Sequence, residues 1–102
     1  MINVVAVITA KNGMRNELLA AFNQNCPAVH AEAGCIEYAA SVDADGFGNI
    51  QTKYGDNTFV VIEKWESKDH LMAHAVSEHM KSYAKKTKEL IADRKIYILS
   101  KA

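Results

Sequence analysis

The chain has 102 residues, of which 49% are hydrophobic and 24% are charged, a composition typical of globular proteins rather than disordered or membrane-spanning ones. Twelve basic residues balance twelve acidic ones, and this neutral balance disfavours nucleic acid or a membrane surface as a partner. The length predicts a single domain over residues 1–102. Because the first residues carry neither a basic segment nor a cleavage pattern, we expect a cytoplasmic protein.

The first part of the chain is predicted to form a strand, a helix and a second strand. Ile2–Ala10 is almost entirely apolar or β-branched, which predicts a strand with both faces buried. Apolar residues then recur at helical spacing over residues 14–29, and Pro27 is expected to kink or end that helix. The alternation over Cys35–Val42 predicts the second strand.

A long polar connection precedes the clearest strand of the sequence. Asp43–Asn57 contains three glycines, and a connection of this length inside a small domain is often a binding loop. We therefore predict a mobile lid over a ligand pocket. Thr58–Trp65 follows and alternates throughout, which predicts the third strand.

Two helical segments and a last strand complete the chain. Ser67 is a plausible N-cap for the first segment, and Ser77 is a plausible cap at which a second segment restarts. The apolar stripe of that second segment extends to Ile91, and Lys95–Ser100 is predicted to form the fourth strand. The order β-α-β-β-α-β is that of a ferredoxin-like α+β fold.

The apolar pattern of the strands predicts a homodimer. The first and third strands are apolar on both faces, whereas the helical segments can cover only one face of a four-stranded sheet. A large apolar surface is rarely left in contact with water, and a second copy of the chain is the simplest cover.

Several cofactor sites are absent from the sequence. The run Gly46-Phe47-Gly48 lacks the third glycine of a dinucleotide fingerprint, and there is neither a phosphate-binding loop nor a nucleophile elbow. His70 and His74 are one helical turn apart, but no HExxH pattern and no third ligand accompany them. We therefore predict no cofactor and no metal.

The candidate catalytic residues are two histidines and a carboxylate. His74 or His79 is predicted to accept a proton at the mouth of a pocket, because the pKa of histidine suits neutral pH. His79 is slightly favoured, since the helix restart at Ser77 frees it from the preceding helix face. Glu63 lies on a strand face and could orient a histidine, although it could equally bond the backbone or a partner subunit.

Three aromatic residues are predicted to form the walls of the pocket: Trp65, Tyr83 and Tyr38. Each of them could equally be an ordinary core residue, and the histidines could equally be surface or packing residues.

The most informative stretch of the sequence resembles the antibiotic biosynthesis monooxygenase (ABM) family. The resemblance is carried by Thr58-Phe59-Val60-Val61-Ile62-Glu63-Lys64-Trp65-Glu66-Ser67 and then by Leu71, Ala73-His74, Ser77, His79-Met80 and Tyr83. The stretch Ala31-Glu32-Ala33-Gly34-Cys35-Ile36 is also similar to the family. The resemblance implies a dimeric α+β barrel and, for several members, cofactor-free oxygenation of quinols or polyketide phenols.

Related branches of the family carry out other chemistry. The haem-degrading branch uses an asparagine, a tryptophan and a histidine where this chain has Ala6, His74 and Ala84, so haem degradation is disfavoured. The resemblance thus predicts a cofactor-independent monooxygenase that acts on a small aromatic, quinol-like substrate with molecular oxygen. The alternatives are an acid–base isomerase of a small ketone and a ligand-binding dimer without turnover.

Overall fold

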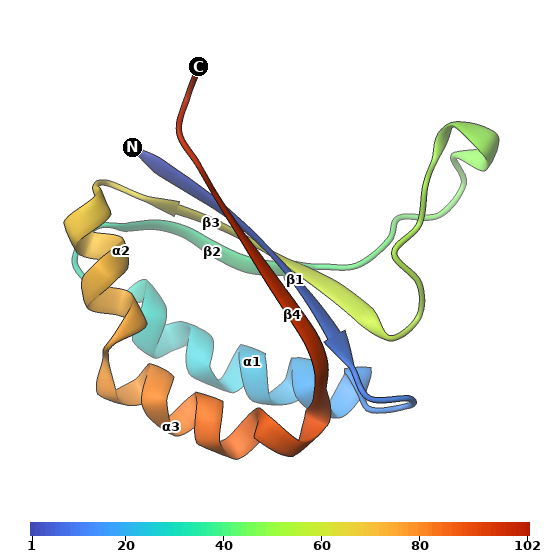
Figure 1. The fold of residues 1–102 in the computed structure, drawn as a ribbon, viewed down its shortest axis with the longest axis horizontal. Helices are drawn as coiled ribbons and strands as arrows, with labels where there is room; N and C mark the ends of the chain where they lie inside the picture. The colour runs from blue at the N-terminus through green and yellow to red at the C-terminus, as the bar shows by residue number, and fades with distance from the viewer.

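The computed structural model describes residues 1–102 as a four-stranded antiparallel sheet with all the helices on one face (Figure 1). The strands are β1 (Ile2–Ala10), β2 (Cys35–Ser41), β3 (Thr58–Trp65) and β4 (Ile91–Leu99), arranged in space as β2-β3-β1-β4. The helices are α1 (Arg15–His30), α2 (Lys68–Ala75) and α3 (Glu78–Thr87), with short 3-10 turns η1 (Gly48–Ile50) and η2 (Lys88–Leu90). This arrangement confirms the predicted ferredoxin-like α+β fold.

The helix boundaries follow local signals in the sequence. The side chain of Ser67 accepts a hydrogen bond from the backbone N–H of His70, which confirms it as the N-cap of α2. Ser77 occupies the N-cap position of α3, but its hydroxyl bonds the carbonyl of His74 instead of capping α3. Pro27 lies in the last turn of α1, which ends at His30. No helix combines the length and apolar character that crossing a bilayer requires.

The core lies between the sheet and α1. Alternate residues of β1 and β3 face the helices, as the two-residue period of a strand requires. Those that are buried include Val4, Ala6, Ile8, Ala10, Phe59, Val61 and Trp65. From α1, Leu18, Phe22 and Val29 close over them. The opposite face of the sheet has no helix over it, and its apolar side chains are only half-buried (Val5, Val7, Val60 and Ile62).

Strand β4 begins at Ile91, so the prediction that a helix continues to Ile91 and that the strand starts at Lys95 was wrong. Ile91 pairs with Ala10 of β1, and the carbonyl of Leu90 accepts a hydrogen bond from the backbone of Lys11. These pairings extend the strand at its start, and the short apolar run suits a helix or a strand equally well.

The last residues of the edge strand β4 are apolar on both faces of the sheet and remain exposed. Ile96 and Ile98 lie opposite Ala6 and Val4 on the helix-facing side and are 51% and 60% exposed. Their neighbours Tyr97 and Leu99 lie on the other side and are also about half exposed.

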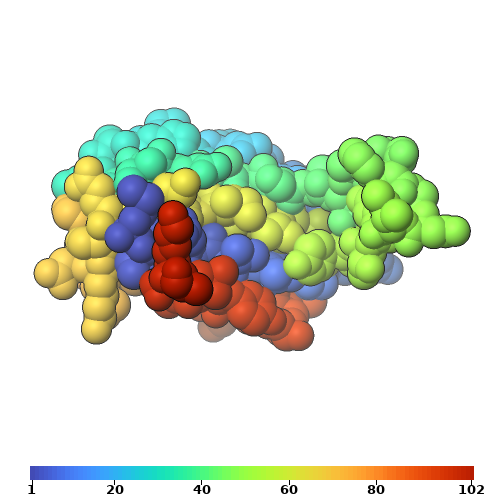
Figure 2. Space-filling view, turned by 90° about the horizontal axis from the view of Figure 1, so that it is seen from above, coloured from blue at the N-terminus to red at the C-terminus, as the bar shows by residue number.

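Residues 43–57, which we call the arm, project away from one end of the sheet (Figures 1 and 2). The carboxylate of Asp43 closes its base by accepting hydrogen bonds from the backbone N–H groups of Tyr54 (3.0 Å) and Gly55 (2.8 Å). The side chain of Tyr54 at this base is exposed to solvent, as are Phe47 and Ile50 beyond it. None of the arm residues lines the main cavity, so the predicted lid does not cover it in this structure.

A tight turn between α1 and β2 fixes the position of α2. Gly34 has a φ of +81°, and its carbonyl accepts a hydrogen bond from the backbone of Glu66 at 2.9 Å. A Cβ atom at this position would overlap the side chain of His70. Helix α2 therefore packs directly against the backbone of this turn.

Candidate active site

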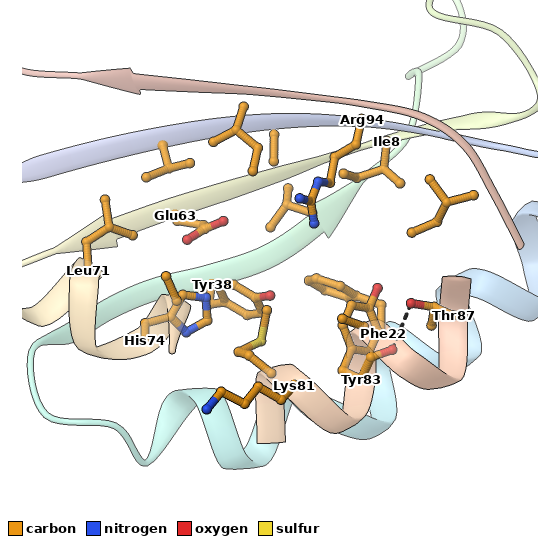
Figure 3. A pocket seen from close by; sticks show the side chains of 18 of the residues that line it. Ile8, Phe22, Tyr38, Glu63, Leu71, His74, Lys81, Tyr83, Thr87 and Arg94 are labelled. Atoms are coloured by element: carbon orange, nitrogen blue, oxygen red, sulfur yellow. Dashed lines mark hydrogen bonds between the residues drawn. The ribbon is translucent and has the colours of Figure 1, made fainter. Parts of the chain in front are cut away.

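A cavity of about 630 Å³ lies between the helix-facing side of the sheet and helices α2 and α3 (Figure 3). Most of its lining is apolar: Ile96 and Ile98 of β4 contribute on the sheet side, and Met80 contributes from α3. A volume of this size suits a small organic ligand. The polar groups that reach the cavity therefore decide what it can bind and do.

His74 is the central polar residue of this cavity. Its ring packs on Trp65 with 4.6 Å between ring centroids and on Tyr38 with 5.4 Å, and the residue is only 5% exposed. Nδ1 is 2.8 Å from the carboxylate of Glu32, whereas Nε2 makes no hydrogen bond within the chain. A neutral histidine that donates through Nδ1 carries its free lone pair on Nε2, which can then accept a proton.

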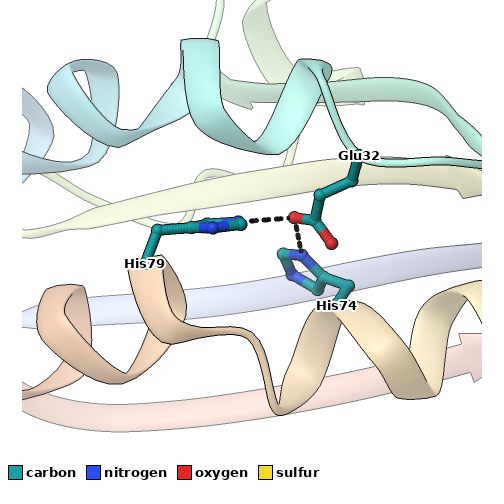
Figure 4. A group of neighbouring side chains, drawn as sticks. All are labelled: Glu32, His74 and His79. Atoms are coloured by element: carbon teal, nitrogen blue, oxygen red, sulfur yellow. Dashed lines mark hydrogen bonds and ion pairs between the residues drawn. The ribbon is translucent and has the colours of Figure 1, made fainter.

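Glu32 lies in the turn after α1 and brings the two candidate histidines together (Figure 4). The same oxygen, Oε2, is 2.8 Å from His74 Nδ1 and 2.8 Å from His79 Nε2. The hydroxyl of Ser77 is also 3.2 Å from His79 Nε2. The sequence did not single out Glu32 as a site residue, because 42 and 47 residues separate it from the two histidines.

Glu63 lies on the helix-facing side of β3, between Tyr38 of β2 and Val4 of β1. It accepts a hydrogen bond from the indole N–H of Trp65 at 2.9 Å. Burial raises the pKa of the Glu63 carboxyl above its usual range, and the nearby Glu32 carboxylate adds to this rise. The Trp65 hydrogen bond and His74 oppose the shift. A protonated Glu63 could donate a hydrogen bond to a ligand oxygen.

Two tyrosines line the cavity and remain protonated at neutral pH. The pKa of Tyr83 is raised to about 12, because the effect of burial outweighs the opposing charge of Arg94. Burial and the Glu63 carboxylate also raise the pKa of Tyr38. Phe22 stacks on Tyr38 and meets Tyr83 edge-on, so both rings are held in place. Their hydroxyl groups are donors that a phenolic oxygen could use.

Three cationic residues line the cavity as well: Lys81, Lys88 and Arg94. In Figure 3, Arg94 reaches in from β4 near Ile8, away from the end that holds Glu63 and His74. Local sequence patterns did not place Lys81, Lys88 or Arg94 at the site, and a strand beginning at Lys95 would have left Arg94 outside the sheet.

The structure places only some of the predicted residues around the cavity. Tyr38, Glu63, His74 and Tyr83 line it together. Trp65 is fully buried behind His74, so the expectation that it forms a wall is not met.

His79 does not point into the cavity and lies instead beside Glu32, against the expectation from the helix restart. His70 bonds Ser67 through Nδ1 and does not converge with His74 on a common site.

The family comparison matches residues 1–86 to the model described as "Antibiotic biosynthesis monooxygenase". The chain is 37% identical over 101 residues to "Probable quinol monooxygenase YgiN" of Escherichia coli (strain K12), covering 97% of this chain and 96% of that protein. The Shigella flexneri protein with the same name matches to the same extent.

Solved structures show the same fold. The crystal structure of PA3566 from Pseudomonas aeruginosa superposes with a TM-score of 0.82 at 25% identity, covering 99% of this chain and 93% of that one. Rv0793 from Mycobacterium tuberculosis superposes with a TM-score of 0.80 at 24% identity, covering 99% and 94%. The extent of the family match and the identity to the Escherichia coli relative lead to one conclusion: the chain belongs to the antibiotic biosynthesis monooxygenase family.

Proposed function

We propose that this protein is a cofactor-independent monooxygenase that oxidises a quinol-like or phenolic substrate with molecular oxygen. One observation carries the proposal: His74 lines a largely apolar cavity, and Glu32 holds its Nδ1 so that Nε2 is left to accept a proton. Membership of the family and the name of the Escherichia coli relative support the same reaction class.

The reaction begins with removal of a phenolic proton by His74 Nε2. The resulting anion is electron-rich enough to reduce oxygen directly, so the protein has to supply a base and a dry pocket. One oxygen atom enters the substrate ring, and the other leaves as water. The quinol supplies all four electrons in becoming a hydroxyquinone, so no external reductant is needed.

The substrate anion needs donors that stabilise its negative charge. Tyr83 keeps its proton at neutral pH, and the cationic Arg94 lies close enough to influence its pKa. These two groups are suited to hold a second substrate oxygen, while His74 acts on the first. Donors fixed in an apolar cavity stabilise developing charge more strongly than water does.

Oxygen consumption with a panel of quinols, without added cofactor and with a chelator present, tests the proposal. We expect turnover above the autoxidation rate, and one labelled atom in the product when isotopically labelled oxygen gas is used. Substrate binding without oxygen uptake would contradict the proposal and indicate a ligand-binding protein without turnover. Labelled oxygen found only in hydrogen peroxide, and not in the product, would indicate an oxidase instead of a monooxygenase.

We further propose that the working form is a homodimer. Support comes from apolar residues exposed on both faces of β4, where Ile96 and Ile98 also border the cavity. The uncovered sheet face and the exposed Phe47 and Ile50 of the arm add to this apolar surface. A second copy of the chain would cover these side chains and close the cavity on its open side.

An acid–base isomerase of a small ketone is the second candidate. The observation in its favour is the cationic lining by Lys81, Lys88 and Arg94, which suits an anionic group such as a phosphate. Exchange of substrate hydrogen with solvent on a phosphorylated ketone, without oxygen uptake, would favour this reaction over the oxygenase.

A further inference from the structure

Three side chains from different segments converge beside the cavity (Figure 4). Glu32 follows α1, His74 belongs to α2 and His79 lies in the first turn of α3. One ligand atom from each residue lies within 4.8 Å of the other two, and both histidine nitrogens are 2.8 Å from Glu32 Oε2. Two imidazoles and one carboxylate make up a common set of ligands for a divalent transition metal.

The charge of Glu32 has no permanent partner in the chain. Its side chain is 13% exposed, and its ion pairs are with His74 and His79 alone, with no lysine or arginine. The side chains of His74 and His79 are 6% and 28% exposed, so the cluster is largely shielded from water. A shielded carboxylate is costly unless a cation is near it, and neutral histidines supply none.

We propose that Glu32, His74 and His79 bind a divalent transition-metal ion, for which Zn²⁺ is the best match. Zinc lies about 2.0–2.2 Å from nitrogen and oxygen ligands, which places tetrahedral ligand atoms about 3.3 Å apart. Two of the separations are now 2.8 Å and the third is at most 4.8 Å. Displacements of about an ångström or less per side chain would therefore create the site, with water as a fourth ligand.

The location of the ion decides what it can do. Neither Glu32 nor His79 lines the main cavity, so an ion bound between them lies behind His74 and away from the substrate. Such an ion can act on the cavity only through the imidazole ring of His74.

The consequence for the reaction depends on the proposed function, whereas the metal site itself does not. When zinc occupies Nδ1 of a neutral imidazole, the ring proton resides on Nε2. His74 would then present an N–H donor to the cavity and could no longer accept the substrate proton. Zinc is therefore expected to inhibit turnover reversibly, and a chelator should restore it.

Trp65 makes binding directly observable, because it is the only tryptophan of the chain and its ring packs 4.6 Å from that of His74. Untagged protein, freed of metal with a chelator, is titrated with Zn²⁺ while tryptophan fluorescence is recorded, and calorimetry gives the stoichiometry. We expect one ion per chain. Cobalt(II) should give the visible absorption of a tetrahedral site.

Matched variants identify the ligands. Glu32→Gln keeps the shape of the side chain, and His79→Ala removes a ligand outside the cavity; each should weaken zinc binding about tenfold or more. The control is His70→Ala, which removes a histidine of the same helix as His74 that bonds Ser67 instead. A second control, Cys26→Ser with Cys35→Ser, removes both free thiols. Both controls should bind zinc as the wild type does.

Three results would overturn the metal site. They are no saturable binding, an affinity that Glu32→Gln and His79→Ala leave unchanged, and loss of binding in the cysteine variant, which would assign zinc to the thiols. Circular dichroism of each variant checks its fold. If zinc binds as expected but no quinol supports oxygen uptake, the proposed reaction fails while the metal site stands.

Discussion

The imidazole of His74 lies on the indole of Trp65, with 4.6 Å between the ring centroids and a 35° angle between their planes. The indole N–H in turn bonds Glu63, so strand β3 holds the ring of His74 from one side. Glu32 holds it from the other side through Nδ1. With these supports the histidine has little freedom to turn, which is what a proton acceptor of fixed direction requires.

Replacement of His74 by alanine should lower the rate of quinol oxidation by about 10²–10⁴-fold, the usual contribution of a positioned base. The KM should change much less, because a base acts mainly in the transition state. His79→Ala is expected to lower the rate less than His74→Ala, since its ring does not reach the cavity. Steady-state kinetics of the two variants, in the presence of a chelator, make the comparison. Equal losses in both would indicate that the histidines act as one unit.

Glu32→Gln should also slow turnover, but through the orientation of His74 rather than through contact with substrate. The amide oxygen can still accept a hydrogen bond from the Nδ1–H group of His74, so the loss should be smaller than in Glu32→Ala. Rates measured for both variants give the test. If glutamine and alanine reduce the rate equally, the negative charge of Glu32 matters rather than its hydrogen bond.

The carboxyl of Glu63 should make the stability of the protein depend on pH. Its pKa is raised in the folded state, so the protonated form is the one that the fold favours. The stabilising contribution of protonated Glu63 to the free energy of unfolding is complete below the ordinary pKa of a glutamate. It is lost as the pH rises through the raised pKa. Glu63→Gln, which keeps an acceptor for Trp65, should therefore remove part of the decline in thermal stability between acidic and neutral pH. Melting temperatures across that range, for both proteins, measure the difference, and parallel curves would contradict the assignment.

The order of the arm should depend on pH in the opposite sense to the effect of Glu63, because the pKa of the Asp43 carboxyl is lowered. Two backbone hydrogen bonds, from Gly55 and Tyr54, lower the pKa of this carboxyl. The carboxylate therefore holds the base of the arm above its ordinary pKa, and this restraint is lost as the pH falls through the lowered value. Asp43→Ala should accelerate hydrogen exchange at the amides of Tyr54 and Gly55 at neutral pH, whereas Asp45→Ala serves as a neighbouring control. Unchanged exchange at these two amides would show that the arm is ordered by other contacts.

The chain should sediment with about twice its 11.3 kDa mass at micromolar concentration. Tyr97→Glu places a charge on the exposed outer side of β4 and should weaken the dimer. Lys101→Glu adds a glutamate just beyond the strand and should leave the dimer intact. A wild-type protein that sediments as a monomer would remove the explanation for the exposed apolar strand.

Local signals in the sequence were sufficient for most of the fold. The alternation of Thr58–Trp65 and the cap at Ser67 depend on neighbouring residues, and both predictions are confirmed. The start of β4 was misplaced because the apolar pair Leu90 and Ile91 suits a helix and a strand alike. Only the pairing with Ala10 of β1 decides between them.

The site was harder to predict because its residues come together through long-range packing. Glu63 and His74 are near each other in sequence, and the structure does place both at the cavity. Glu32 and Arg94 arrive from distant segments, and no local pattern indicates where they point. The direction of His79 also depends on Glu32, which accepts a hydrogen bond from it and was not among the residues that the sequence singled out.

The turn at Gly34 sets a limit on how this protein can be redesigned. Any side chain there would collide with His70 and displace α2, and His74 lies one helical turn further along the same helix. The base would then move relative to Glu32 without any change in the residues of the cavity itself. A library that varies residues 31–35 to alter the ligand should therefore keep position 34 as glycine, and an alanine there should reduce activity while every cavity-lining residue remains in place.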